Sequence, residues 1–517
     1  MNTDAIKLDR IDEIIRAHGT EQHCLIPLLQ AVQAEYNYLP EKAMRRICEL
    51  TSITPSSIMS VSTFYSRFRH KPAGRHFVRV CVGTACYVKG ADTVFESFRR
   101  NLNIEGDEDT DVQLVFTVEK VPCLGCCMLA PAVMIDDVTY GFVKPPETGN
   151  ILRDFLNSRA GSDSDRKAAG TQGGLHGEIR LCLCSSCAAG GGEAVYKEIV
   201  RQVGKLGLKI KIKIVGCTGI SYRSPLIELI AGNGKEFRYG MMKPEDIRGI
   251  LLKHFKPTGK AQRLSAVVYG GLESLLTGGS DEPADSFAVD FRDSYDGDYW
   301  NSQCRIATLN GGEIQPLDLE EYKAAEGFAA LETAVKHMTP DEVIRVVSES
   351  GLRGRGGAGY PTGVKWSNVR GRSSEMKYVI CNGDEGDPGA FMDRMVMESF
   401  PFRVIEGTAL AAFAVGAQEC YLYIRAEYPL AARRIEKAID LCIEHGILGC
   451  NVMGSNLSLR FHVVRGAGAF VCGEETALIA AIEGRRGMPR FRPPYPSERG
   501  LWDRPTLVNN VETLAMT

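Results

Sequence analysis

The sequence lacks three features that would assign it to a specialised class of protein. Its formal net charge is only −3 over 517 residues, so it has no excess of the kind that favours nucleic acids or anionic membranes. No apolar run reaches the roughly 18 residues that a membrane-spanning helix needs. The first residues, MNTDAIKLDRIDEIIRAHG, contain no apolar core of a signal peptide. We therefore expect a soluble cytoplasmic protein that binds no nucleic acid and does not insert directly into a membrane.

Cysteine, in contrast, is abundant and unevenly placed. Five of the 17 cysteines fall in residues 81–127 and four in residues 182–217. Disulfides are rare in a reducing cytosol, so these two groups need another explanation. The sequence predicts that the scattered cysteines are small, buried apolar residues; they are Cys24, Cys48, Cys304, Cys420, Cys442 and Cys450.

The chain is long enough for about three or four domains, and its pattern predicts an α/β multidomain fold. Residues 78–86 (VRVCVGTAC) resemble residues 179–187 (IRLCLCSSC). In both, a strand leads into a Cys-x4-Cys loop and then a helix, which indicates two copies of one domain. We expect a helical bundle (1–75), a first α/β domain (76–156), a linker (157–178), a second α/β domain (179–256), a linker (257–300) and a larger α/β domain (301–517).

Hydrophobic periodicity and turn residues give the elements inside these units. In the first α/β domain we expect strands at 77–82, 113–118 and 132–135 and a helix at 91–101; in the largest domain we expect helices at 319–338, 340–350 and 427–446 and strands at 377–381, 419–424 and 459–465.

The first cysteine group has metal-ligand spacing. Cys81, Cys86, Cys123 and Cys127 give Cys-x4-Cys, a long gap and Cys-x3-Cys. Two loops that each deliver a pair of thiolates suit a [2Fe–2S] cluster, which takes two on each iron. A structural zinc site also uses paired cysteines, so the spacing alone leaves both open.

The residues around this group resemble the family of 24-kDa subunits of respiratory complex I. The resemblance covers residues 8–156 and includes CVGTACYVKGA and CLGCCMLAPAVMIDDVTYGFV. It implies a helical N-terminal part followed by a thioredoxin-like domain with one [2Fe–2S] cluster on Cys81, Cys86, Cys123 and Cys127. The repeat at 179–256 is then expected to be a second thioredoxin-like domain. Cys126 is then a bystander.

The second group repeats this pattern incompletely. Cys182, Cys187 and Cys217 match three of the four positions, Ser221 takes the fourth, and Cys184 is an additional thiol. Three interpretations stay open: a docking domain without a cluster, a cluster with Ser221 or Cys184 as an unusual ligand, or a site for another metal.

Three segments of the largest domain have the composition of a ligand site. GLRGRGGAGYPTGVKW (351–366) fits G-x-G-x-x-G, but a helical pattern precedes it, so the usual dinucleotide fingerprint does not apply. Its open, basic backbone suits a planar or phosphorylated ligand, and a flexible loop is the alternative. NGDEGDPGAFMDR (382–394) favours turns or a site at a strand end. In GAGAFVCGEETALIAAIEG (466–484), Glu474 and Glu475 suit a helix start or ribose hydroxyls.

Two further segments, YIRAEYPLAARRI and PTLVNNVETLA, follow the same pattern. With these five ordered motifs, this part of the chain resembles the family of 51-kDa flavoproteins of complex I and its hydrogenase and formate dehydrogenase relatives. The resemblance covers residues 300–517. It implies an atypical Rossmann-like domain that binds FMN, with NADH as substrate. By position, the flavin site would comprise Gly354, Arg355, Gly356, Gly357, Lys365, Asn382, Asp384, Glu385, Gly473, Glu474, Asn509, Asn510 and Thr513. The NADH site would comprise Tyr360, Asp387, Phe470, Glu475, Arg492 and Tyr495.

The implied activity is that of an NADH dehydrogenase. Hydride passes from NADH to FMN, and single electrons pass to iron–sulfur clusters on this chain and on partner subunits, with no catalytic acid or base on the protein. Glu475 predicts NADH over NADPH. The family's C-terminal [4Fe–4S] domain is missing after Thr517, so we expect diaphorase activity with artificial acceptors and poor delivery to a physiological partner. A non-catalytic electron-transfer or docking subunit of such a complex and an unrelated zinc protein are the alternatives.

Overall fold

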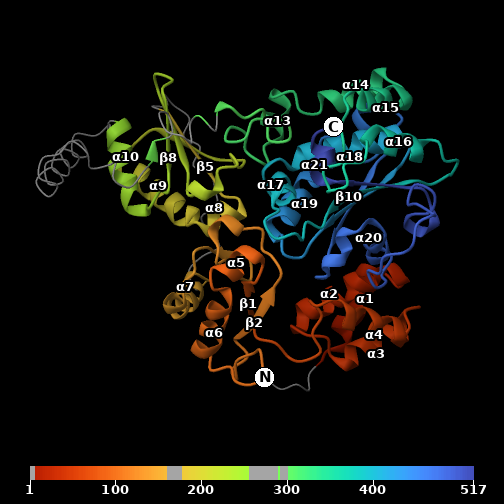
Figure 1. Ribbon diagram of the computed structural model, residues 1–517, viewed down its shortest axis with the longest axis horizontal. Coiled ribbons are helices and arrows are strands. Elements are labelled where there is room, and N and C mark those ends of the chain that lie inside the picture. Colours follow the sequence, from red (N-terminus) through yellow and green to blue (C-terminus); the bar gives the residue numbers. More distant parts are fainter. Residues whose placement is uncertain (1–5, 160–176, 256–288, 291–297, 299–300) are drawn as a thin grey trace, which may run out of the picture.

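The computed structural model describes residues 6–159, 177–255, 289–290, 298 and 301–517 (Figure 1). Three β-sheets and an N-terminal group of helices organise these residues, which confirms the α/β multidomain fold. No helix formed by them is long and apolar enough to cross a bilayer. Both expected linkers lie largely outside the described residues. At their edges, α7 (Thr148–Arg159) runs to residue 159 and β5 (Gly177–Cys182) begins at residue 177.

The N-terminal bundle consists of α1 (Leu8–His18), α2 (Leu25–Tyr36), α3 (Glu41–Leu50) and α4 (Pro55–Phe64). In α1, Ile11, Ile14 and Ile15 form the buried face. Helix α4 begins where the Thr54 side chain accepts a hydrogen bond from the Ser57 amide, with Pro55 in the first turn.

The first sheet has the order β2-β1-β3-β4. It contains β1 (His76–Cys81), β2 (Phe116–Val121), β3 (Val133–Ile135) and β4 (Val138–Tyr140), with helices α5 (Thr84–Val88), α6 (Ala91–Asn101) and α7. The prediction of a strand at 113–118 was three residues early. The Asp111 carboxylate accepts hydrogen bonds from the amides of Val115 and Phe116, and this turn delays the start of β2.

The second sheet repeats this arrangement. Strand β5 lies between parallel β6 (Ile210–Val215) and antiparallel β7 (Ile227–Ala231), as β1 lies between β2 and β3. Strand β8 (Glu236–Gly240) follows, and β9 (Val289–Asp290) adds a strand from within the expected second linker. Helices α8 (Ser185–Ala189), α9 (Gly192–Leu206) and α10 (Ile247–His254) complete the unit.

The third sheet is fully parallel, with the order β12-β11-β10-β13. Its strands are β10 (Tyr378–Gly383), β11 (Glu419–Ile424), β12 (Arg460–Arg465) and β13 (Thr506–Asn510). The helices are α13 (Leu319–Ala324), α14 (Ala329–His337), α15 (Pro340–Glu349), α16 (Thr362–Arg370), α17 (Met392–Ser399), α18 (Pro401–Val415), α19 (Pro429–Glu444), α20 (Glu475–Ile482) and α21 (Val511–Ala515).

The single helix expected at 319–338 is wrong, because the chain breaks between α13 and α14. Glu326 and Phe328 adopt left-handed backbone conformations. A side chain at Gly327 would collide with the Tyr322 ring, 2.3 Å away. Phe328 is then buried against Tyr322 and Phe402.

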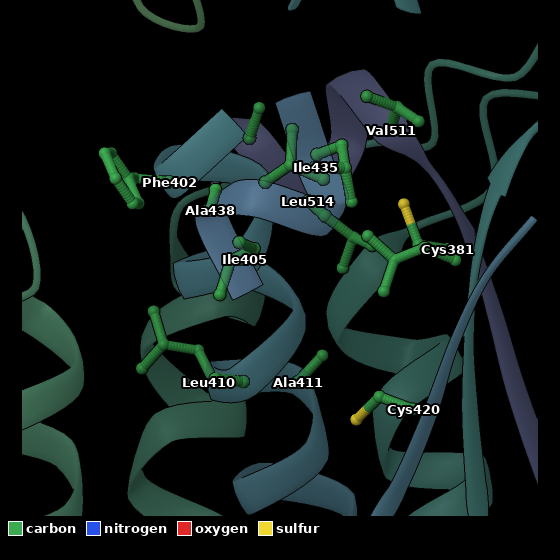
Figure 2. Packing of buried hydrophobic residues seen from close by; sticks show 14 of the residues in the cluster. Cys381, Phe402, Ile405, Leu410, Ala411, Cys420, Ile435, Ala438, Val511 and Leu514 are labelled. Atoms are coloured by element: carbon green, nitrogen blue, oxygen red, sulfur yellow. The ribbon is translucent and has the colours of Figure 1, made fainter. Parts of the chain in front are cut away.

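Each face of the third sheet is covered by different helices. On one face, Figure 2 shows Ile405 of α18 near Ile435 of α19, with Ala411 further along α18, in the cluster that also contains Cys381 of β10. On the other face, Ile380 belongs to the core that includes the N-terminal helices. The alternation of Cys381 and Ile380 follows the two-residue period of a strand.

The N-terminal bundle is held to this domain by hydrogen bonds to main-chain carbonyl groups. The Gln22 amide donates to the Gly484 carbonyl at 2.8 Å, Gln30 donates to Gly466, and the Tyr65 hydroxyl donates to Arg485. In Figure 1 the bundle accordingly lies beside α20, although the two are at opposite ends of the sequence.

Candidate functional site

The candidate site lies at the carboxyl edge of the third sheet. Because all four strands are parallel, their C-terminal ends lie along one edge, where α/β sheets bind ligands. The acidic segment 384–391 follows β10, the segment 466–474 follows β12, and α21 follows β13. The sheet therefore brings together three of the motifs that the sequence analysis singled out.

The glycine-rich loop reaches this edge from outside the sheet. It lies between α15 and α16, so the expectation that it is no ordinary strand–loop–helix fingerprint is confirmed. The Gly354 amide donates to the Tyr360 carbonyl at 2.8 Å, and the Arg355 amide donates to the Thr513 hydroxyl at 2.9 Å. Gly356 and Gly357 are exposed, and within the described residues their amides donate to no acceptor. They are available to a ligand.

Asp384 gives the clearest test of whether these residues fit a ligand. The Asn382 side chain donates to the Gly473 carbonyl at 2.9 Å and accepts from the Asp384 amide at 3.0 Å. Asn382 thus fixes the main chain at Asp384. The Asp384 side chain has a buried carboxylate oxygen, Oδ2, with no hydrogen-bond partner in the described part of the chain. Burial raises the pKa of Asp384 to about 7, against the opposing charge of Arg425. A ligand hydroxyl group would satisfy this oxygen, so the site fits the ribityl chain of FMN.

Glu385, the next residue, is used differently. Its carboxylate accepts hydrogen bonds from the amides of Asp393 and Arg394 at 3.1 and 3.2 Å, in the first turn of α17. Its main-chain carbonyl accepts from the Tyr428 hydroxyl at 2.9 Å. Burial raises the pKa of Glu385. The structure thus places Glu385 next to the site as a brace for α17.

Asn509, Asn510 and Thr513 are also engaged within the protein. The Asn509 side chain accepts from the Trp366 indole N–H at 2.9 Å, and the Asn510 side chain donates to Asp393 at 2.6 Å. Thr513 holds the glycine-rich loop through its contact with the Arg355 amide. These three residues of β13 and α21 therefore hold α16, α17 and the glycine-rich loop together.

Lys365, Glu475 and Arg492 form one charged group. The Lys365 ammonium lies 2.9 Å from one oxygen of Glu475, and the Arg492 guanidinium lies 2.8 Å from the other. Glu474 begins α20 by accepting hydrogen bonds from the amides of Thr476 and Ala477. Lys365 was expected at the flavin and Glu475 at the nucleotide, and the structure brings them into contact.

Three aromatic rings around the site are exposed. Tyr360, Phe470 and Tyr495 are 48%, 59% and 52% exposed. The Phe470 ring lies on the backbone of Gly386, where an added Cβ would be 2.4 Å from the ring. Asp387 is also exposed. Exposed aromatic rings suit stacking against a planar ligand.

The first cysteine group lies beside the acidic segment. Cys81 ends β1, Cys86 lies in α5, and Cys123 and Cys127 are on the loop after β2. The Cys123 and Cys127 sulfurs are 3.6 Å apart, and hydrogen bonds from the thiols of Cys127 and Cys81 lower the pKa of Cys123. The Gly125 amide donates to the Cys123 sulfur at 3.3 Å. Four thiols from two loops with amide donors fit a [2Fe–2S] cluster.

One hydrogen bond connects this group to the sheet edge. The Gly389 amide, in the acidic segment, donates to the Cys127 sulfur at 3.2 Å. The loop that carries Asp384 and the loop that carries Cys127, an expected cluster ligand, are therefore in direct contact. No pattern in the sequence predicted this contact.

Sequence reasoning also missed Arg394. Its guanidinium is buried and donates to the Gly125 carbonyl at 2.9 Å and to the Ser186 hydroxyl at 2.7 Å, and it pairs with Glu398 at 3.2 Å. It therefore joins both cysteine loops to α17. The only signal in the sequence was an arginine directly before the apolar residues Met395, Val396 and Met397.

The scattered cysteines follow the expectation only in part. Cys24, Cys420 and Cys442 are buried, but Cys304 and Cys450 are exposed, which corrects the prediction for them, and Cys48 is half-buried. Cys126 is buried and accepts a hydrogen bond from the Ser186 hydroxyl at 3.9 Å.

Comparison with known families identifies two parts of the chain. Residues 347–516 match the Nuo51 FMN-binding domain, and residues 11–156 match the thioredoxin-like [2Fe–2S] ferredoxin. Both resemblances stated from the sequence are thereby confirmed. The chain contains an FMN-binding domain of the first kind and a [2Fe–2S] domain of the second.

Curated relatives cover part of the chain. The chain is 53% identical over 213 residues to HndC, a component of the NADP-reducing hydrogenase of Solidesulfovibrio fructosivorans, covering 41% of this chain and 43% of that protein. It is 51% identical over 197 residues to a component of the NADH-quinone oxidoreductase of Rhizobium meliloti, covering 38% and 47%. The chain thus spans less than half the length of these relatives.

A solved structure matches nearly the whole chain. It is the crystal structure of an NAD⁺-reducing [NiFe]-hydrogenase in the air-oxidized state, with a TM-score of 0.54 and 22% identity. The match covers 94% of this chain and 59% of that chain. It supports the fold across both thioredoxin-like units and the flavin domain.

Proposed function

We propose that this chain, in which a Nuo51 FMN-binding domain and a thioredoxin-like [2Fe–2S] domain are joined, is the NADH-oxidising input module of a larger redox assembly. Bound FMN would supply the conversion of a two-electron hydride into single electrons. The protein's own residues bind the cofactors, orient the nicotinamide and exclude water. No side chain is needed as a proton donor or acceptor.

The observation that carries this proposal is the hydrogen bond from Gly389 to Cys127. It joins the segment that carries Asp384 to a cysteine of the [2Fe–2S] set. A flavin site and a cluster site that share a loop contact are suited to electron exchange. A scaffold without redox activity would have no need for this contact.

Individual residues have distinct roles in the proposal. Asp384 accepts a hydrogen bond from a ribityl hydroxyl group, since its Oδ2 is buried without a partner in the described residues. The free amides of Gly356 and Gly357 face the flavin, and the exposed Phe470 ring stacks with the nucleotide. Glu385, Asn510 and their neighbours keep these groups in position.

The nucleotide preference is less strongly encoded than the sequence suggested. Glu475 was expected to repel the 2′-phosphate of NADPH. Both of its oxygens are paired, with Lys365 and Arg492, and this reduces the net repulsion. We propose that NADH is still preferred, because Glu474 adds a second carboxylate 4.0 Å from Arg492.

We propose other iron–sulfur subunits as partners and the cytoplasm as the location. The curated relatives are named as subunits of a hydrogenase and of NADH-quinone oxidoreductases. All 17 cysteines are free, as is usual in a reducing compartment.

An anaerobic NADH titration of the FMN-loaded protein tests the proposal. Flavin absorbance and the EPR signal of reduced iron would be followed together. We expect the flavin to bleach and a [2Fe–2S] signal to appear. If the cluster signal appears only with dithionite while the flavin never responds to NADH, the chain is a docking subunit and the proposal is refuted.

A further inference from the structure

The second cysteine group is more compact than the first. The sulfur atoms of Cys182, Cys184, Cys187 and Cys217 all lie within 4.8 Å of one another, and all four residues are buried. Four thiolates around one metal ion, at about 2.3 Å each, form a tetrahedron with edges of about 3.8 Å. The observed group can close on a single ion with small shifts.

The first group does not share this shape. Among the described residues, only the second group meets the geometry of a set of ligands for one metal ion; Cys81, Cys86, Cys123 and Cys127 do not. A [2Fe–2S] cluster uses two thiolates on each of two irons, so thiolates on different irons are further apart than one tetrahedral edge. The second group thus has the geometry of a single-ion site, whereas the first is not gathered in that way.

The repeat explains how the second group became compact. Ser221 takes the place of Cys127, and Cys184 takes the place of Gly83. In the first unit, a Cβ added at Gly83 would lie 3.7 Å from the Cys123 sulfur. A side chain at that position therefore points at the ligand group. The fourth thiol of the second unit is therefore on the first cysteine loop, at Cys184, and not on the second loop, where Ser221 stands.

We propose that Cys182, Cys184, Cys187 and Cys217 form a closed mononuclear metal site, with one zinc ion as the expected occupant. Zinc is commonly bound by four cysteines in structural sites, and a buried set of four thiolates leaves no open position for substrate. This proposal does not depend on the proposed function, because a structural ion carries no electrons.

Groups around the site support a thiolate centre. The Cys184 amide donates to the Cys182 sulfur and the Gly219 amide donates to the Cys217 sulfur, both at 3.3 Å. A divalent ion with four thiolates carries a net charge of −2. Arg394 contacts Ser186 at 2.7 Å, and Arg434 contacts the Leu183 carbonyl at 3.5 Å, so two cations touch the loop.

The site also lies where the second thioredoxin-like unit docks on the flavin domain. The Ser185 amide donates to Glu398 at 2.8 Å, and the Cys217 amide donates to the Ser399 hydroxyl at 2.9 Å. Both acceptors belong to α17, which Glu385 braces at its other end. A metal ion that fixes the cysteine loops therefore also fixes this junction.

Metal and sulfide analysis of the full-length purified protein is the test. We expect one zinc ion per chain in addition to the two irons of the first cluster. The variant Cys184→Ala should lose the zinc, whereas Ser221→Ala should retain it. Thermal unfolding and [2Fe–2S] content report whether each variant is folded. If Cys184→Ala does not fold, Co²⁺ substitution of the unaltered protein decides, since four-thiolate Co²⁺ has intense visible absorption.

Each outcome bears directly on the site. Zinc lost in Cys184→Ala and retained in Ser221→Ala supports it. One sulfide-free iron in place of zinc also supports a mononuclear site, although it refutes zinc as the occupant. A second [2Fe–2S] EPR signal with four irons per chain overturns the proposal. So does the absence of any metal at this site together with a cobalt spectrum that lacks the thiolate bands.

Discussion

Replacing Asp384 by asparagine should stabilise the FMN-free protein in a pH-dependent way. Asp384 has a buried carboxylate oxygen without a partner in the described residues, and burial raises its pKa from 3.8 to about 7. The charged form is therefore less favourable in the folded chain than in the unfolded one. Asparagine has nearly the same shape and carries no charge, so the variant removes this cost.

The pKa shift sets the size and the pH range of the effect. A shift of about three units, at 1.36 kcal/mol per unit, corresponds to at most about 4 kcal/mol. The folded pKa is the higher one, so the cost is absent below about pH 4, grows between pH 4 and pH 7 and is constant above pH 7. Asp384→Asn should therefore raise the free energy of unfolding by several kcal/mol at pH 8 and by much less at pH 5.

Thermal and urea unfolding at pH 5 and pH 8, without FMN, would measure this gain. Asp387→Asn is the matched control, since Asp387 is exposed in the same segment and its replacement removes no buried charge. In a separate FMN titration of the apoprotein, Asp384→Ala should weaken FMN binding by about 10- to 100-fold, because it loses a hydrogen bond to a charged group. An equal gain at both pH values, or unchanged FMN affinity in Asp384→Ala, would refute this account.

Three further predictions concern other parts of the site. Phe470→Ala removes an exposed stacking ring, so it should raise the KM for NADH about 3- to 10-fold with FMN content unchanged; steady-state kinetics that show an effect on kcat alone would contradict the assigned role. Cys127→Ser should abolish the [2Fe–2S] EPR signal, while NADH still bleaches the flavin; loss of the flavin response as well would show that the two sites cannot be separated. Glu475→Gln frees Lys365 and Arg492 from their shared partner, so it should raise kcat/KM for NADPH relative to NADH by about tenfold; an unchanged ratio would remove Glu475 from nucleotide selection.

Much of the fold could be predicted from local patterns. The helix at 91–101 and the strands at 419–424 and 459–465 agree closely with α6, β11 and β12, because each has a clear hydrophobic period. The failures were also local. The break between α13 and α14 depends on left-handed residues that are not glycine, and the late start of β2 depends on one aspartate side chain.

The site residues illustrate a different limit. Glycine and acidic motifs identified the segments that the sheet brings together, but the roles within them depend on neighbours. Asp384 and Glu385 are adjacent and chemically similar, yet the Asp384 oxygen has no partner in the described residues and the Glu385 carboxylate braces α17. Their tertiary neighbours distinguish them: α17 binds the Glu385 carboxylate, and Asn382, held by the Gly473 carbonyl, fixes the main chain at Asp384.

The sequence by itself determined the α/β class, the repeated unit and the two cysteine groups, because spacing and periodicity are properties of a linear chain; the thioredoxin-like fold and the flavin site came from the resemblance of its ordered motifs to known families. Tertiary structure alone decided three contacts between distant segments: Gly389 with Cys127, Arg394 with both cysteine loops, and the N-terminal bundle with α20. It also gathered Cys184 with three other thiols in a compact group. Such contacts arise from how separately folded units pack against each other, and no local pattern encodes that packing.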